Sequence, residues 1–230
     1  MSRTYSSSAS FTRAAEAAPA TARSLFVFAL IYGGMTVIAG VLAFKQVALG
    51  GLAVESGIFA FLLLVVLSSS VAQLHGRQMA DRLVLWGFVP LAISVLLIFI
   101  VLQLPPSAEM PAGNITAFET VLSSTPRIMA AGPVAYGVSL LLNVWLFDRL
   151  RGSGAAGASG WAMMLRGAVA SAVSQALDTV IFITLAFYGE FPIGDLILGQ
   201  ALAKIVLSFV FVPPLIVGAV KAGRWLDGRG

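Results

Sequence analysis

Two charged residues, Asp178 and Lys204, lie inside long apolar stretches of this sequence. Asp178 belongs to the stretch Trp161–Tyr188, and Lys204 belongs to the stretch Ile193–Val220. A charge at the centre of a bilayer costs about 2.5–3.5 kcal/mol on insertion scales, so such residues are rare and usually face a cavity or a partner. A carboxylate and an ammonium at that depth can pair with each other, bind a polar substrate or carry a proton.

Hydrogen-bonding and small residues surround Asp178 on one face of its expected helix. At 100° per residue, a set of positions falls within about 40° of one line along that helix. The set is Gly167, Ser171, Ser174, Gln175, Asp178, Phe182 and Gly189. On the next expected helix, Gln200 lies one turn from Lys204. The sequence therefore predicts a polar stripe with an aromatic floor that faces a second polar helix.

The depth of the two charges indicates a site near the middle of the membrane. Asp178 and Lys204 lie about ten residues from the expected outer ends of their helices, or ~15 Å deep at 1.5 Å per residue. The stripe contains more hydrogen-bonding groups than one ion pair uses, which favours a polar substrate or a proton site. The alternative is that the two residues only neutralise each other and fix helix packing.

Three further polar residues have both a functional and a structural interpretation. His75, the single histidine, lies near an expected inner interface. It is either a hydrogen-bonded interfacial residue or a proton relay. Arg166 lies on a different face from Asp178, and a long basic side chain near a helix end ordinarily reaches for the headgroups. Asn143 either bonds across helices or contacts a ligand.

The absence of cysteine from the sequence excludes several kinds of chemistry. Disulfides, thiolate catalysis and cysteine-based metal sites are impossible, and one histidine makes a zinc site unexpected. The segment Gly157–Gly160 has the look of an intramembrane serine-protease motif. A serine nucleophile needs a base within hydrogen-bond reach, and His75 lies far upstream. We expect no enzyme activity, no metal and no cofactor.

Composition predicts an all-α integral membrane protein. The chain is 59% hydrophobic and 10% charged, whereas a soluble globular chain is about 25% charged. A span needs about 20 mostly apolar residues, and helices satisfy their own backbone in lipid. Six transmembrane helices are expected, at Leu25–Phe44, Gly57–His75, Leu83–Leu104, Arg127–Phe147, Trp161–Tyr188 and Ile193–Val220. The stretch Lys45–Ser56 is a loop, a re-entrant piece or an extension of the second helix. Pro105–Pro126 is expected to be a long polar loop, and Arg149–Gly160 is expected to be a flexible Gly/Ser/Ala linker.

The distribution of lysine and arginine predicts that both termini are cytoplasmic. Most basic residues fall on the expected inner segments, and the expected outer loops hold only Lys45, with Arg127 at a helix end. Residues 1–24 are expected to form a flexible cytosolic tail without a signal peptide, residues 25–220 the membrane domain and residues 221–230 a short basic tail. The basic residues form no patch, so the net charge of +4 indicates membrane orientation and not nucleic-acid binding.

The segment around Asp178 carries a motif that resembles a known family. It reads Leu165-Arg166 … Ser174-Gln175-x-x-Asp178-Thr179-x-x-Phe182 … Ala186-Phe187-x-Gly189. It resembles the motif of the queuosine precursor transporter family, also called the VUT family, and the similarity runs over about residues 25–220. The resemblance implies a six-helix protein of the bacterial inner membrane that takes up 7-deazapurines, notably 7-cyano-7-deazaguanine.

The resemblance also implies a set of substrate-binding residues. These are Asp178, Gln175, Thr179, Lys204, Phe182, Asn143, Gln73, His75 and Arg166. In typical members the second helix ends with two acids, approximately T-D-x-x-N-E-x-Y-G. Here the matching segment, Ser68–Gly76, is neutral, and Asn143 replaces an acid in the fourth helix. A carboxylate can accept two hydrogen bonds from a guanine-like edge, so losing such acceptors could shift the substrate preference.

The main hypothesis is an importer of a planar, uncharged heterocycle. Asp178 and Gln175 would bind its polar edge, Lys204 would balance Asp178, and an aromatic ring of Phe182, Phe187 or Trp145 would stack on its face. The first alternative is a substrate-capture subunit of a multi-component vitamin or nucleobase uptake system, which needs separate ATPase and coupling subunits. The second alternative is a non-transporting membrane scaffold. The expected partners are a small molecule and the bilayer.

Overall fold

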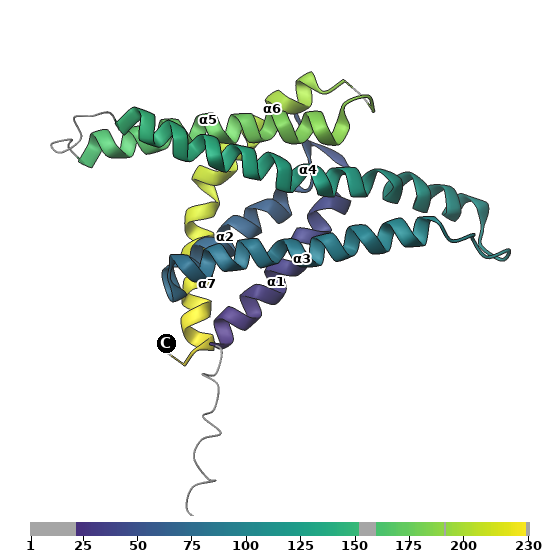
Figure 1. The fold of residues 1–230 in the computed structure, drawn as a ribbon, viewed down its shortest axis with the longest axis horizontal. Helices are drawn as coiled ribbons and strands as arrows, with labels where there is room; N and C mark the ends of the chain where they lie inside the picture. The colour runs from purple at the N-terminus through teal and green to yellow at the C-terminus, as the bar shows by residue number, and fades with distance from the viewer. Residues whose placement is uncertain (1–21, 152–159, 191, 229–230) are drawn as a thin grey trace, which may run out of the picture.

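The computed structural model describes residues 22–151, 160–190 and 192–228, and nearly all of its regular structure is helical (Figure 1). The elements in chain order are α1 Arg23–Leu42, β1 Gln46–Leu49, β2 Leu52–Glu55, α2 Ile58–His75, α3 Arg77–Leu102, α4 Ala112–Arg151, α5 Gly160–Phe187, α6 Gly194–Val210 and α7 Val212–Leu226. The predicted tail boundary at residue 24 and the predicted boundary at residue 221 fall inside α1 and α7. Most of the predicted N-terminal tail lies outside the described residues.

Several helices are long and apolar enough to cross a membrane. Among the described residues these are α1, α2 and α3, and the bent pair α6–α7 adds a fourth when it is taken as one span. Length and composition thus indicate a multi-pass membrane protein. The helices α4 and α5 occupy the places of the fourth and fifth expected spans, and their crossing remains a prediction, as do the count of six and the side of each terminus.

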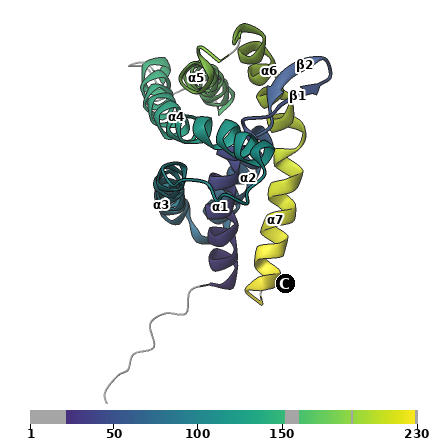
Figure 2. The same cartoon turned by 90° about the vertical axis from the view of Figure 1, so that its right-hand side faces the viewer.

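The helices form two groups that α4 and α6 connect. One group contains α1, α2, α3 and α7, and the other contains α4 and α5, which lie side by side along much of their length (Figure 1). Figure 2 shows α7 running along one side of the molecule, with the β-hairpin next to α6. Direct contacts of α4 with α3 and α1, and contacts of α6 with β2, α5 and α7, connect the two groups.

The ambiguous stretch after α1 is a β-hairpin, which is a departure from an all-helical fold. Its strands pair antiparallel, with Gln46 opposite Glu55 and Leu49 opposite Leu52. The turn between them is Gly50-Gly51, with φ of 56° and 84°. A two-residue hairpin turn of this kind requires positive φ, which glycine adopts without steric cost. The short strands therefore follow from the local Gly-Gly sequence.

Two predicted helix boundaries are wrong. The fourth helix begins at Ala112 instead of Arg127 and passes through both Pro126 and Pro133, so much of the predicted polar loop is helical. Proline removes one hydrogen bond from a helix but does not forbid its continuation when neighbouring groups compensate. The third helix begins at Arg77 instead of Leu83, directly after Gly76, whose φ of 86° ends α2.

The sixth expected helix is broken in two. Its halves, α6 and α7, meet at Phe211 and are bent by 50°. Proline occupies positions 213 and 214, at the start of α7. A proline at the first turn lacks only an N–H that would be unsatisfied there, so it starts a new helix more easily than it continues an old one.

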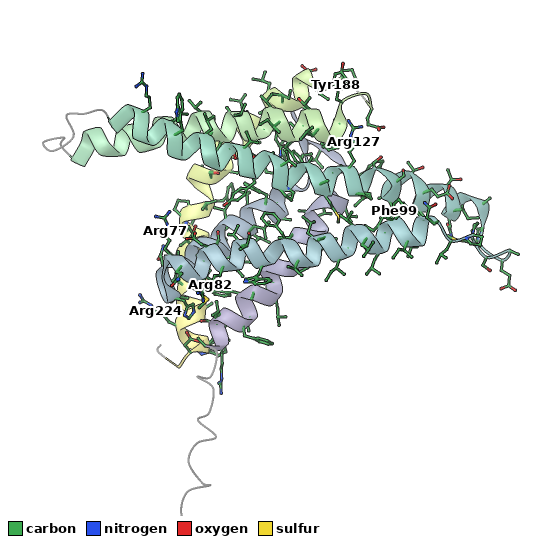
Figure 3. The ribbon with its side chains drawn as sticks, in the orientation of Figure 1. Arg77, Arg82, Phe99, Arg127, Tyr188 and Arg224 are labelled. Atoms are coloured by element: carbon green, nitrogen blue, oxygen red, sulfur yellow. The ribbon has the colours of Figure 1, made fainter. Side chains whose placement is uncertain are left out.

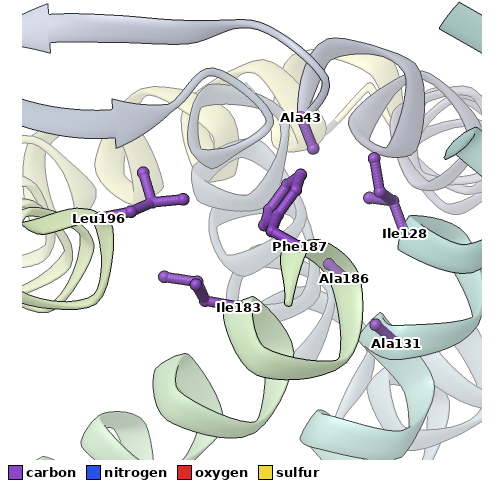
Figure 4. Close-up of a cluster of buried hydrophobic side chains, with 7 residues drawn as sticks. All are labelled: Ala43, Ile128, Ala131, Ile183, Ala186, Phe187 and Leu196. Carbon is purple, nitrogen blue, oxygen red and sulfur yellow. The ribbon is translucent and has the colours of Figure 1, made fainter. Parts of the chain in front are cut away.

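One apolar cluster fixes the end of α5 against α1, α4 and α6. Phe187 lies at its centre, surrounded by Ala43, Ile128, Ala131, Ile183, Ala186 and Leu196 (Figure 4). Near it, Arg127 of α4 donates hydrogen bonds to the carbonyl oxygens of Leu185 (2.7 Å) and Tyr188 (2.8 Å) at the C-terminal end of α5 (Figure 3). These carbonyls have no partner within their own helix, so the arginine satisfies them and holds the two helices in register.

Candidate functional site

Asp178 and Lys204 form an ion pair between α5 and α6. Lys204 Nζ lies 2.8 Å from Asp178 Oδ2, and the two side chains are 7% and 16% exposed, respectively. Ser139 of α4 reaches Asp178 Oδ1 at 3.4 Å. The 2.8 Å contact between the ammonium and the carboxylate has the length of a strong charge-assisted hydrogen bond. Three helices thus converge on one largely buried carboxylate.

The ammonium of Lys204 also lies over an aromatic ring. Its Nζ is 4.9 Å from the centre of the Phe61 ring on α2. A cation within about 6 Å of a ring face is attracted by the ring quadrupole. Lys204 is therefore held by a carboxylate on one helix and an aromatic face on another, which fixes its position between the two helix groups.

A second buried acid, Glu55, lies close by and was missed by sequence reasoning. Gln200 Nε2 donates to Glu55 Oε1 at 2.5 Å, and Gln200 Oε1 accepts from the Glu55 backbone N–H at 3.2 Å. Glu55 is 4% exposed and Gln200 is fully buried. The Gly-Gly pair is a sequence signal for a hairpin turn. Alternation along the strand that follows the turn then places Ala53 and Glu55 on one face and Leu52 and Val54 on the other.

These groups open onto a cavity of about 210 Å³ between the two helix groups. An engineered cavity of about 150 Å³ holds benzene, so this space is large enough for a somewhat bigger ring system. Its polar or titratable lining residues are Tyr32, Thr36, Glu55, Ser68, Tyr136, Asp178 and Lys204, and its aromatic hydrocarbon rings are Phe61, Phe88 and Phe182. A mostly apolar wall with a few convergent polar groups is typical of small-molecule sites.

The three aromatic residues proposed as stacking partners fall in different places. Phe182 lines the cavity and makes an edge-on contact with Phe187, with ring centres 6.1 Å apart. Phe187 itself is buried in the apolar cluster, and Trp145 is 60% exposed. Phe88 of α3, which sequence reasoning did not select, lines the cavity and packs against Tyr136. Phe61 lines the cavity beneath the ammonium of Lys204, so Phe182 and Phe88 are the phenylalanine rings that a ligand can stack on without displacing that charge.

Those remaining residues of the predicted substrate-binding set whose side chains the structure describes do not line this cavity. Thr179 is fully buried and its hydroxyl donates to the carbonyl of Gln175 one turn earlier, while the Gln175 side chain is exposed. Gln73 is exposed near the end of α2. Asn143 and Arg166 belong to α4 and α5, but their side chains lie outside the described part of the chain.

His75 takes part in a separate polar cluster at the opposite end of α2. Ser24 Oγ lies 2.7 Å from His75 Nε2 and donates to Asp227 Oδ2 at 2.8 Å, and the Ser24 N–H donates to Asp227 Oδ1 at 2.9 Å. Ser24 is fully buried. The cluster joins the start of α1, the end of α2 and the residue that follows α7, so its geometry is that of a structural tie.

Comparison with known proteins bears on the fold and on the site. The chain is 26% identical over 185 residues to the "Probable queuosine precursor transporter" of Bacillus subtilis (strain 168), which covers 79% of this chain and 78% of that protein. No solved structure matches the present chain. The model of the family described as "Putative vitamin uptake transporter" matches residues 55–218, a segment that contains Glu55, Asp178 and Lys204. Because this match spans more than half of the sequence, the chain belongs to that transporter family.

Proposed function

We propose that this protein imports a planar, uncharged heterocycle, a queuosine precursor such as 7-cyano-7-deazaguanine or a related 7-deazapurine, across a bacterial inner membrane. The cavity carries the proposal, because it combines a buried ion pair with aromatic rings between two groups of helices. The family and the name of the Bacillus subtilis relative support the transport class and the type of substrate.

The chemistry of the cavity suits a flat molecule with polar edges. The carboxylate of Asp178 accepts hydrogen bonds from ring N–H groups, and the ammonium of Lys204 donates to a carbonyl or ring nitrogen. Phe182 and Phe88 offer apolar faces on which such a ring can stack. At the two positions where typical members have acids in the second helix, this chain has Ser69 and Gln73. The residue of this segment that lines the cavity is Ser68, so α2 offers no charged acceptor there.

The test is uptake by purified protein in liposomes. We expect saturable uptake of radiolabelled 7-cyano-7-deazaguanine. Unlabelled 7-deazapurines that bind the same site should compete with this uptake. Asp178→Asn should strongly reduce uptake because it removes the only negative charge that contacts Lys204 among the described residues. Glu119→Gln, an exposed acid on α4, is the matched control and should leave uptake unchanged.

Three results are informative. Wild-type uptake by Asp178→Asn would remove this residue from the mechanism. Binding of the ligand without any uptake would favour the substrate-capture subunit over the transporter. If the wild-type protein neither binds nor takes up any 7-deazapurine in the panel, the proposed substrate class is wrong.

A further inference from the structure

The charges that line the cavity do not balance if every acid is ionised. Lys204 is already paired with Asp178. The other acid among the described lining residues is Glu55, which is almost fully buried. A buried carboxylate without its own cation is costly, and such a group ordinarily takes up a proton instead of staying charged. The cavity is therefore neutral when Glu55 is protonated and carries one negative charge when it is not.

Glu55 is held on one side and open on the other. Gln200 donates to Oε1 of Glu55 and accepts from the backbone N–H of Glu55, and these two hydrogen bonds fix the carboxyl group in one orientation. Oε2 of Glu55 is buried and accepts no hydrogen bond of good geometry among the described residues, and the backbone of Gly57 is a polar group close enough to act on the carboxyl. This oxygen lies beside Gly57, which also lines the cavity. A proton on Oε2 would turn an unsatisfied acceptor into a donor that a ligand can use.

Of the two acids that line the cavity, Glu55 is the one whose protonation breaks no ion pair. Among the described residues, the titratable groups that line the same cavity are Lys204 from α6, Asp178 from α5, Tyr136 from α4 and Tyr32 from α1. The lining residues from α2 and α3 carry no titratable group. Protonating Asp178 would leave Lys204 without its partner, whereas protonating Glu55 leaves the ion pair intact.

The pKa of Glu55 agrees with this geometry. The residue ends β2, outside the helices that could span the membrane. Burial raises the pKa of Glu55 from 4.5 to about 6, and Lys204, the backbone of Gly57 and Gln200 oppose part of this rise. A group with this pKa can gain and lose a proton close to physiological pH.

We propose that Glu55 is the proton-binding acid of the cavity and that one proton enters with each substrate molecule. The proposal rests on the proposed function and adds its energy source. A proton from water on one side forms an O–H bond at Oε2, which makes the site neutral and ready for an uncharged substrate. On the other side the substrate leaves, the O–H bond breaks and the proton returns to water.

The experiment compares uptake with and without a proton gradient in liposomes whose membrane potential is clamped at zero. The probe is radiolabelled 7-cyano-7-deazaguanine. With one proton per substrate, a gradient of one pH unit should raise wild-type accumulation about tenfold. Glu55→Gln should lose this gradient-driven accumulation but still exchange labelled for unlabelled probe at equal pH. Glu55→Asp retains a titratable group and should keep the gradient dependence at a lower rate.

Two controls separate folding and substrate from coupling. Glu109→Gln removes an exposed acid and should behave as wild type. Infrared titration without substrate should show a protonated carboxyl that Glu55→Gln lacks. This readout also shows that the variant is folded when its other bands are unchanged.

The outcomes distinguish the two proposals. Gradient-driven accumulation that persists in Glu55→Gln, or an infrared signal unchanged by this substitution, overturns the role of Glu55 while the transport function stands. Wild-type uptake that ignores the gradient overturns coupling alone. A wild-type protein that takes up no probe overturns the proposed function and, with it, the coupling that depends on it.

Discussion

At the residue scale, the contacts of Lys204 and Asp178 raise the question of whether the pair serves packing or transport. Both side chains are largely buried, and each is the other's ionic partner. Removing one member of a buried pair leaves an uncompensated charge, which typically costs 3–5 kcal/mol, while replacing both by apolar groups of similar size is often tolerated. Single and double substitutions therefore separate the two roles.

We expect Asp178→Asn and Lys204→Met to lower the free energy of unfolding by about 3–5 kcal/mol each. The double variant should regain most of that loss but should still fail to take up substrate. Denaturant unfolding in detergent and liposome uptake measure the two properties on the same samples. A double variant that transports as wild type would mean that the pair only fixes helix packing.

The tie between Ser24, His75 and Asp227 gives a second prediction at this scale. Ser24→Ala removes two side-chain hydrogen bonds, one of them to a carboxylate, and should lower the free energy of unfolding by about 1.5–3 kcal/mol. Thermal unfolding is the measurement. The control is Ser123→Ala, at an exposed position on α4, which should have little effect. Equal melting temperatures for the two variants would contradict the structural role of this cluster.

At the element scale, the β-hairpin determines where Glu55 lies because it packs against α6 without space to spare. A Cβ atom at Gly199 would overlap the carbonyl oxygen of Ala53. Only a glycine at this position of α6 lets the strand come close enough for Gln200, the next residue, to bond Glu55. Helix and hairpin thus form one unit that positions the second acid of the cavity.

Gly199→Ala should force the hairpin away from α6. We expect a loss of about 1–3 kcal/mol in unfolding free energy, which is typical of overpacking, together with weaker gradient-driven uptake. Gly194→Ala lies on the same helix, where a Cβ meets no atom within 4 Å, and is the matched control. Thermal unfolding and uptake measure the pair. Equal stability of both variants would show that the hairpin tolerates displacement.

At the scale of the whole molecule, the two ends of the described chain lie together. Ser24 lies in the first turn of α1 and Asp227 follows α7, and their hydrogen bonds hold these ends side by side. Ends on one side of a bilayer require an even number of crossings. This agrees with the expected six spans, although only α1, α2, α3 and the bent α6–α7 pair have the length and composition of spans among the described residues.

The absence of native cysteine makes this topology directly testable. We expect a membrane-impermeant thiol reagent to label Glu109→Cys from the outside and Gly228→Cys only from the inside. Ala155→Cys, between α4 and α5, should also label from the inside if both helices cross. Labelling of positions 109 and 155 from the same side would exclude a crossing by α4 and reduce the number of spans.

The sequence alone indicated the class of protein and placed its two central charges on consecutive helices. Its composition indicated a membrane protein, and the count of residues from the helix ends predicted a similar depth for Asp178 and Lys204, which made an ion pair between them possible. Proline alone did not predict where helices end. A new helix starts at Pro213 and Pro214, whereas α4 continues through Pro126. The loss of one backbone hydrogen bond is compatible with either outcome.

Only the tertiary structure decided which residues share the cavity. Glu55 and Gln200 are 145 positions apart, and nothing in either local sequence specifies that a hairpin will pack on α6 at Gly199. Gln175 and Thr179 lie within one turn of Asp178, yet only Asp178 lines the cavity. Periodicity fixes the angle of a residue around its own helix, whereas the packing of neighbouring elements fixes which angles face an open space, and that packing depends on contacts between distant segments.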